Sequence, residues 1–151
     1  MPHFRKPLPH VPPGFVRGGS WFFITMCCGH RSHNELCRAG VSESLMADAL
    51  FYHRRGHWHL HLFLLMPDHL HMIAAFPREL HLSEVVRNWK RLTTRRTGVC
   101  WQKNYFDHRI RPGESLQIKT NYIRQNPVRA GLAAREDEWP YFLDPLTLEG
   151  R

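Results

Sequence analysis

Residues 66–73 read Met-Pro-Asp-His-Leu-His-Met-Ile and decide how the centre of the fold is built. The Pro-Asp pair is typical of a tight turn, and the apolar runs on either side, residues 57–65 and 69–76, predict the two strands of a hairpin. In an extended strand His69 and His71 project from the same face, while the leucine between them points the other way into a core. The two imidazoles could bind one divalent metal ion, although two ordinary surface histidines would give the same pattern.

The register of this hairpin follows from the length of its turn. If the turn contains only the Pro-Asp pair, Leu64 faces His71 and Met66 faces His69. Three more histidines of the first strand then lie on the opposite face of the hairpin: His57, His59 and His61. A one-residue bulge would reverse that placement. These three side chains could form a solvated or DNA-facing surface, or they could bind a metal.

Hydrophobic patterning predicts the remaining elements. Two more strands are expected over residues 20–28 and 105–111, and three helices over residues 41–55, 83–96 and 114–126. The last helix should end at Asn126, because a residue before proline avoids helical geometry. This order of elements predicts an α+β fold in a single domain, a ferredoxin-like antiparallel sheet with helices packed on one face.

The chain is strongly basic. Among its 151 residues, 21 lysines and arginines against 13 acidic residues give a net charge of +8 and an isoelectric point near 9.9. This excess favours a polyanionic partner, either nucleic acid or an anionic membrane surface. No apolar stretch approaches the roughly 20 residues that span a bilayer, and the N-terminus shows no secretion signal. We therefore expect nucleic acid as the partner, no membrane, and a cytoplasmic location that is nucleoid-associated when DNA is bound.

The four cysteines form no paired framework, which fits a reduced cytoplasmic setting. They are Cys27, Cys28, Cys37 and Cys100. A loosely zinc-like spacing connects four residues, Cys27, His30, His33 and Cys37. The end of a buried strand followed by a polar loop explains the same residues.

Tyr122 and Asn126 lie four residues apart on the predicted last helix, and are therefore neighbours on one helical face. The buried stripe of that helix is expected to contain Leu116, Thr120 and Ile123, with Tyr122 beside it. The Asn126 amide oxygen could complete a metal shell started by two histidines, leaving positions for water and a phosphate oxygen. Taken alone, a helical tyrosine is more often a packing residue.

Two histidines, an amide and a tyrosine around one metal ion suit the cutting of phosphodiesters. The ion would polarise the scissile phosphate and offset its growing charge. The phenol of Tyr122 would attack phosphorus and displace a sugar hydroxyl, leaving a covalent phosphotyrosine. Because one phosphoester replaces another, a second strand could later be joined without ATP.

These motifs resemble those of a known family. His69-Leu70-His71 matches the HUH motif, and its surroundings resemble the Met-Pro-Asn-His-Val-His of single-tyrosine HUH transposases. Residues 122–131, Tyr-Ile-Arg-Gln-Asn-Pro-Val-Arg-Ala-Gly, resemble the family's Tyr-Ile-x-x-Asn-Pro-Val-x-x-Gly, which contains the catalytic tyrosine. Weaker matches occur at residues 17–25, at 105–111 and at Trp139-Pro140. Asp68 stands where the family usually has Asn, and we expect its side chain to cap the turn.

Within that superfamily, the IS-two-hundred-like transposases, the chain most resembles the REP-associated tyrosine transposases. The resemblance implies a ferredoxin-like fold, Mg²⁺ or Mn²⁺ dependence, and cleavage of single-stranded DNA next to a hairpin through a 5′-phosphotyrosine. It assigns residues 20–135 to the catalytic domain and 136–151 to a C-terminal tail. Residues 1–19, rich in Pro and Gly and basic at Arg5, Lys6 and Arg17, predict an extended basic arm. The resemblance implies that this arm helps to read a guide sequence. Relatives occur as monomers and homodimers.

Several cations are candidates for contacts with DNA phosphates. On the helix over residues 83–96 they could act together with Trp89 as a base-stacking surface, or simply form a solvated face. The full predicted set is Arg17, Lys90, Arg91, Arg95, Arg109, Arg111, Arg124 and Arg129. Two other functions remain open: a non-catalytic, domesticated nucleic-acid-binding module of the same fold, and a zinc-dependent hydrolase built on the histidine-rich hairpin.

Overall fold

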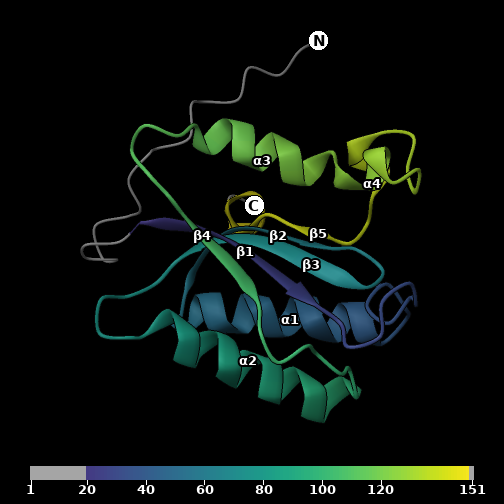
Figure 1. The fold of residues 1–151 in the computed structure, drawn as a ribbon, viewed down its shortest axis with the longest axis horizontal. Helices are drawn as coiled ribbons and strands as arrows, with labels where there is room; N and C mark the ends of the chain where they lie inside the picture. Colours follow the sequence, from purple (N-terminus) through teal and green to yellow (C-terminus); the bar gives the residue numbers. More distant parts are fainter. Residues whose placement is uncertain (1–19, 150–151) are drawn as a thin grey trace.

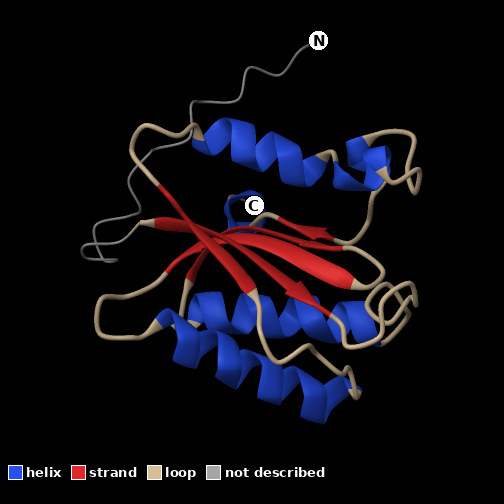
Figure 2. Cartoon of the chain, viewed as in Figure 1, coloured by secondary structure: helices blue, strands red, loops and turns tan. Residues whose placement is uncertain are grey.

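The computed structural model describes residues 20–149, so the predicted arm over residues 1–19, including Arg17, lies outside the described residues. Five strands form one antiparallel sheet in the order β4-β1-β3-β2-β5 (Figures 1 and 2). Along the chain the elements are β1 Trp21–Cys27, α1 Val41–Arg54, β2 His59–Leu65, β3 His69–Ala75, α2 Leu82–Thr97, β4 Phe106–Ile110, α3 Leu116–Arg124, α4 Asn126–Arg129, the 3-10 turn η1 Glu136–Glu138, β5 Phe142–Leu143 and α5 Pro145–Glu149.

Helices cover both faces of the sheet. In Figure 1, α1 and α2 lie together below the sheet, and α3 lies above it. The side chains of β3 alternate accordingly. Leu70 and Met72 belong to the core between the sheet and α1 and α2, whereas Ile73 belongs to the core between the sheet and α3. The α+β class, the antiparallel sheet and the single domain are confirmed. The expected packing of helices on one face holds for α1 and α2 only. The reason is that β2 is apolar on both faces, so the second face also needs a cover.

The central hairpin has the predicted register near its turn. Leu64 pairs with His71, and the Met66 amide donates to the His69 carbonyl (2.8 Å). The register shifts between Leu60 and Leu62, which leaves His61 as a bulge.

This bulge overturns the predicted placement of the other histidines. His61 is buried on the same face as His71: its ring lies 5.3 Å from that of Trp21, and it is hydrogen-bonded to Thr120 of α3. His59, on the far side of the bulge, pairs with Ala75 of the same face. His57 lies in the loop before β2 and is exposed. The predicted separation of these histidines from His69 and His71 is therefore wrong for His59 and His61.

The last helix is divided in two at Gln125. α3 ends at Arg124, and the predicted continuation to Asn126 is replaced by α4, which begins at Asn126. Pro127 sits in the first turn of α4, where its missing N–H is not needed by the helix. Gly131, with φ of 73°, ends α4 in the left-handed conformation that glycine adopts without strain.

Trp89 packs in the core, so it cannot belong to the base-stacking surface that was one of the two interpretations of its helix. Its side chain is fully buried, and its ring lies 5.7 Å from that of Trp58 and 5.9 Å from that of Phe63. We expect Trp89→Ala to lower the free energy of unfolding by about 3–5 kcal/mol, because it leaves a large cavity. Arg91→Ala, on the exposed face of the same helix, should change it by at most about 0.5 kcal/mol. Urea unfolding of the two variants measures this; equal stabilities would contradict the placement of Trp89.

Candidate active site

His69 and His71 are presented side by side by β3, and each is oriented by a neighbour. Their rings are 4.9 Å apart. His71 Nδ1 is hydrogen-bonded to Thr25 Oγ1 of β1 (2.8 Å), and His69 Nδ1 donates to Asp68 Oδ1 (2.7 Å). Both Nδ1 atoms are therefore engaged, which leaves the two Nε2 atoms as the nitrogens available to a metal ion. Histidine ligands in metalloproteins are commonly held in this way by a second hydrogen bond.

The electrostatic environment keeps His71 neutral. Its burial, followed by the nearby His69, Arg129 and Arg31, lowers its pKa to about 3. Neutral imidazole is the form that binds metal ions.

The Asp68 side chain, expected from the sequence to cap the turn, bonds instead to Ser32, Arg31 and His69. Burial opposes its ionisation, but hydrogen bonds from the Ser32 amide and from His69 outweigh burial and lower its pKa. Asp68 Oδ2 also lies 3.1 Å from Arg31 Nε. The charged carboxylate is thereby fixed in place, and it fixes His69 in turn.

Tyr122 and Asn126 lie at the junction of α3 and α4, where Arg129 joins them. The Tyr122 side chain is 54% exposed, and the Arg129 guanidinium carbon lies 4.1 Å from the centre of its ring. Arg129 Nη2 donates both to the Tyr122 carbonyl and to Asn126 Oδ1, each at 2.7 Å. Asn126 Nδ2 is buried without a hydrogen-bond partner among the described residues.

The histidines and Tyr122 belong to one face of the sheet. Phe23 of β1 connects them: its ring lies 5.5 Å from that of His71, and it lines a pocket of about 340 Å³ together with Tyr122. The charge of Arg129 reaches His71 as well, since it contributes to the lowered pKa of that histidine. The histidine pair of β3 and Tyr122 of α3 therefore belong to one face of the sheet and are connected through Phe23.

A metal ion bound by His69 and His71 would need a third ligand that is not a His, Cys, Asp or Glu side chain. Within residues 20–149, no group of three or more His, Cys, Asp or Glu side chains could hold a metal ion. Asn126 offers an amide oxygen, which accepts from Arg129 Nη2 in this structure. By donor chemistry, His69, His71 and Asn126 would suit a two-histidine, one-amide set, and Arg129 holds the Asn126 oxygen that such an ion would use.

The alternative zinc site at Cys27, His30, His33 and Cys37 finds no support in the described part of the chain. Burial raises the pKa of the Cys37 thiol to about 12, whereas zinc binds thiolates. Its sulfur faces the Leu65 carbonyl.

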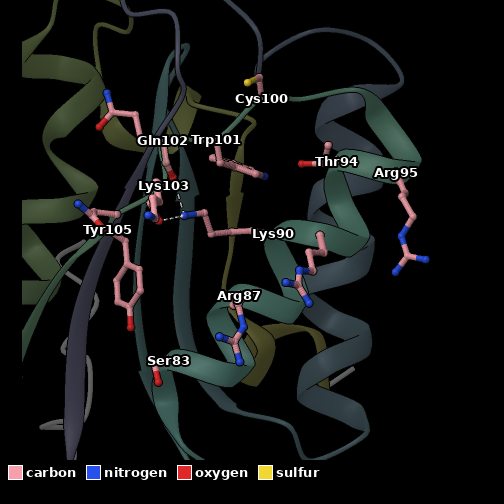
Figure 3. A pocket seen from close by; sticks show the side chains of 12 residues that line it. Ser83, Arg87, Lys90, Thr94, Arg95, Cys100, Trp101, Gln102, Lys103 and Tyr105 are labelled. Carbon is pink, nitrogen blue, oxygen red and sulfur yellow. Dashed lines mark hydrogen bonds between the residues drawn. The ribbon is translucent and has the colours of Figure 1, made fainter.

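A second surface with chemical character is the basic groove, defined as the pocket of about 820 Å³ between α2 and residues 100–105 (Figure 3). Arg87, Arg91 and Arg95 line it from α2, and none of them has a carboxylate within ion-pair distance among residues 20–149. Lys90 Nζ instead donates to the carbonyls of Gln102 (2.6 Å) and Lys103 (3.2 Å), so it connects α2 to the opposite wall of the groove.

The remaining predicted cations are dispersed. Of these predicted cations, Arg129 contacts the ring of Tyr122. Arg109 pairs in register with Phe22 and so belongs to the face of α2, and its Nε donates to Ser20 Oγ. Arg111 is exposed after β4. The Arg124 guanidinium lies 3.6 Å from Glu136 and stacks on Phe142, so DNA would have to compete with both.

The sequence analysis missed most of the residues that surround Tyr122. These are Phe106, His108, Glu114, Ile118 and Lys119, which complete the pocket that Phe23 and Tyr122 line. Strand alternation is the signal that could have found two of them, because Phe106 and His108 share one face of β4.

Known proteins resemble this chain in sequence and in fold, although no protein-family model matches it. The REP-associated tyrosine transposase of Escherichia coli strain K12 is 23% identical over 133 residues, which cover 84% of this chain and 77% of that protein. A Haemophilus influenzae protein that provisionally bears the same name is 29% identical over 91 residues, 55% of this chain and 51% of that protein. The structure of a REP-associated tyrosine transposase bound to a REP hairpin superposes with a TM-score of 0.71 and 24% identity, covering 89% of this chain and 82% of that one.

These relatives confirm the resemblance that the two motifs indicate, and the structural match confirms the fold. Because the relatives are transposases by name, they support a transposase-family role for this chain. No helix among residues 20–149 is long and apolar enough to cross a membrane.

The hydrogen bonds and the charge of Arg129 lead to a testable prediction about metal binding. Arg129→Met keeps an apolar stem of similar length but removes the cation and its hydrogen bonds. We expect the affinity for Mn²⁺ to rise about tenfold, because a charge-assisted hydrogen bond no longer holds Asn126 Oδ1 and a nearby like charge is lost. Isothermal titration with Mn²⁺ measures this. Arg135→Met, which removes an exposed cation paired with Asp137 and Glu138, is the control and should change the affinity less than about twofold. Unchanged affinity in Arg129→Met would contradict a role for Asn126 as ligand.

Proposed function

We propose that the chain is a metal-dependent transposase or endonuclease that cleaves and rejoins single-stranded DNA next to hairpin repeats through a 5′-phosphotyrosine intermediate. The observation that supports this proposal is that Phe23 contacts both His71 and the pocket of the exposed Tyr122, so the oriented histidine pair and the tyrosine belong to one face of the sheet. The exposure of Tyr122 matters because a tyrosine buried for packing could not reach a phosphate.

In the proposed reaction Tyr122 is the nucleophile. Its phenolic oxygen forms a bond to phosphorus as the bond from phosphorus to the 3′ oxygen breaks, and the proton lost by the phenol is balanced by protonation of that leaving oxygen. A 3′ hydroxyl of another strand reverses the exchange and frees the tyrosine. Mg²⁺ or Mn²⁺ held by His69, His71 and Asn126 would supply charge stabilisation at the phosphate.

The proposed partner is single-stranded DNA with a hairpin. The net charge of +8 and the arginines of the basic groove, which have no carboxylate partner among residues 20–149, suit a phosphate backbone. The similar structure bound to a REP hairpin supports the same kind of ligand here. Within this proposal the protein acts as a monomer or a homodimer and without a membrane, in the cytoplasm or on the nucleoid.

The tyrosine assignment is tested by a covalent adduct. Tyr122→Phe should abolish the denaturant-resistant adduct with a labelled hairpin substrate in Mn²⁺, while hairpin binding changes less than about threefold, because only the attacking oxygen is lost. Adduct is read on a denaturing gel, and binding by fluorescence anisotropy. Tyr141→Phe makes the same change beside Trp139 and should leave the adduct intact. Equal adduct from wild type and Tyr122→Phe would refute the proposal, and hairpin binding without any adduct would favour the non-catalytic binding module.

The histidine assignment is tested by the metal dependence. His71→Ala should lose Mn²⁺ binding and cleavage together. Thr25→Val, which removes only the hydroxyl that orients His71, should weaken Mn²⁺ binding by about 10–100-fold. His57→Ala changes an exposed loop histidine and serves as the control. Cleavage that survives in chelator, or in His71→Ala, would contradict the role given to the metal.

A further inference from the structure

The pocket beside Tyr122 has the features of a ligand-binding site. Three large apolar side chains around it are unusually exposed: Phe106 at 59%, Ile118 at 68% and Tyr122 at 54%. A cluster of exposed apolar groups around a hollow is typical of a surface that a ligand covers. Its volume of about 340 Å³ lies within the range of small-molecule sites.

Charged groups of both signs form the other wall of this pocket. His108 Nε2 donates to Glu114 Oε2 (2.9 Å), and Lys119 Nζ lies 3.7 Å from the same oxygen. The hydrogen bond from His108, followed by that from the Arg111 amide, lowers the pKa of Glu114, so the carboxylate stays ionised. The wall therefore offers a fixed hydrogen-bond acceptor next to an ammonium donor.

The pocket lies in line with the histidine pair. Thr25 of β1 pairs with Phe106 on one side and with His71 on the other, so the three residues form one row across neighbouring strands. Two strand spacings, about 10 Å, separate Phe106 from His71 along this row. A strand whose scissile phosphate meets Tyr122 would bring the neighbouring nucleotide over Phe106.

We propose that this pocket holds the base of a nucleotide adjoining the scissile phosphate. The base stacks on Phe106, and Glu114 accepts a hydrogen bond from its exocyclic amino group. Aromatic side chains stack on any base, whereas a carboxylate accepts from an amino group such as that of cytosine. Thymine, the DNA base without an amino group, is disfavoured at this position. This inference rests on the proposed function, because it takes DNA as the substrate and Tyr122 as the nucleophile.

The experiment varies the two nucleotides that flank the cleavage site. A pool of hairpin substrates with all bases at both positions is converted to adduct by wild-type protein, and the products are sequenced. At one flank thymine should be under-represented by about 5-fold or more, in line with 1–3 kcal/mol for a specific base contact. Glu114→Gln should reduce this discrimination to within about twofold. Glu138→Gln, at an exposed site away from the pocket, should retain it.

A binding arm separates this inference from the proposed reaction. In the Tyr122→Phe background the strand stays uncut, and anisotropy gives the affinity for each flanking base, including an analogue of the preferred base without its amino group. That analogue should bind as weakly as thymine does, and Glu114→Gln should erase the difference. Phe106→Ala should weaken binding to all bases alike. Adduct formation with no thymine discrimination, or discrimination that survives in Glu114→Gln, would overturn the pocket assignment alone. Base discrimination in binding without any wild-type adduct would overturn the proposed reaction and support the pocket.

Discussion

The need to cover both faces of the central hairpin is the constraint on which the site depends. β2 and β3 present apolar side chains in both directions, with Phe63 and Met72 on one face and Leu64 and Ile73 on the other. α1 and α2 bury the first face. The second face is closed by Leu116 and Ile123 of α3, and burial of such apolar area is the main force that holds an element in place. The same contact leaves Tyr122 exposed on the face of the sheet that carries the histidine pair, so packing and site geometry have one origin.

Arg129 contacts the groups that the proposed reaction would use. Its guanidinium has three partners, the Tyr122 ring, the Tyr122 carbonyl and the Asn126 oxygen, and its charge disfavours further positive charge at His71. A phosphate is a stronger partner for a guanidinium than an amide is, because the hydrogen bonds are charge-assisted and bidentate. A DNA phosphate arriving at Tyr122 would therefore compete with Asn126 for Arg129. The same event would release the Asn126 oxygen that the proposed metal ion would use.

Short-range pattern predicted much of this fold, and contacts distant in the sequence decided the rest. The Pro-Asp turn and the alternation of His69 and His71 are local, so the hairpin register near the turn was predictable. The bulge at His61 was not, since it arises where Trp21 and Thr120 pack around that ring. Trp89 sits among basic residues in the sequence, yet the aromatic rings that bury it come from β2 and the loop before it.

The candidate site divides in the same way. Helical spacing predicted that Tyr122 and Asn126 are neighbours. They remain neighbours despite the break at Gln125, because α4 begins directly after it. No spacing rule could show that Arg129 would take the Asn126 oxygen, or that Asp68 and Thr25 would orient the two histidines. These contacts form between side chains that meet only when the elements pack. They determine how the histidines and the amide are oriented toward a metal ion.

The edge strand β4 connects the two surfaces that carry chemical character. Tyr105 and Phe106 are consecutive, but Tyr105 lines the basic groove on the α2 side, whereas Phe106 lines the pocket beside Tyr122 under α3. Strand alternation continues the division, because His108 faces α3 and Arg109 faces α2. β4 pairs with β1 alone in the described sheet, so its outer edge is not covered by a further strand. A single polyanionic strand passing over that edge would meet the groove cations and the Tyr122 pocket in succession, without the sheet having to open.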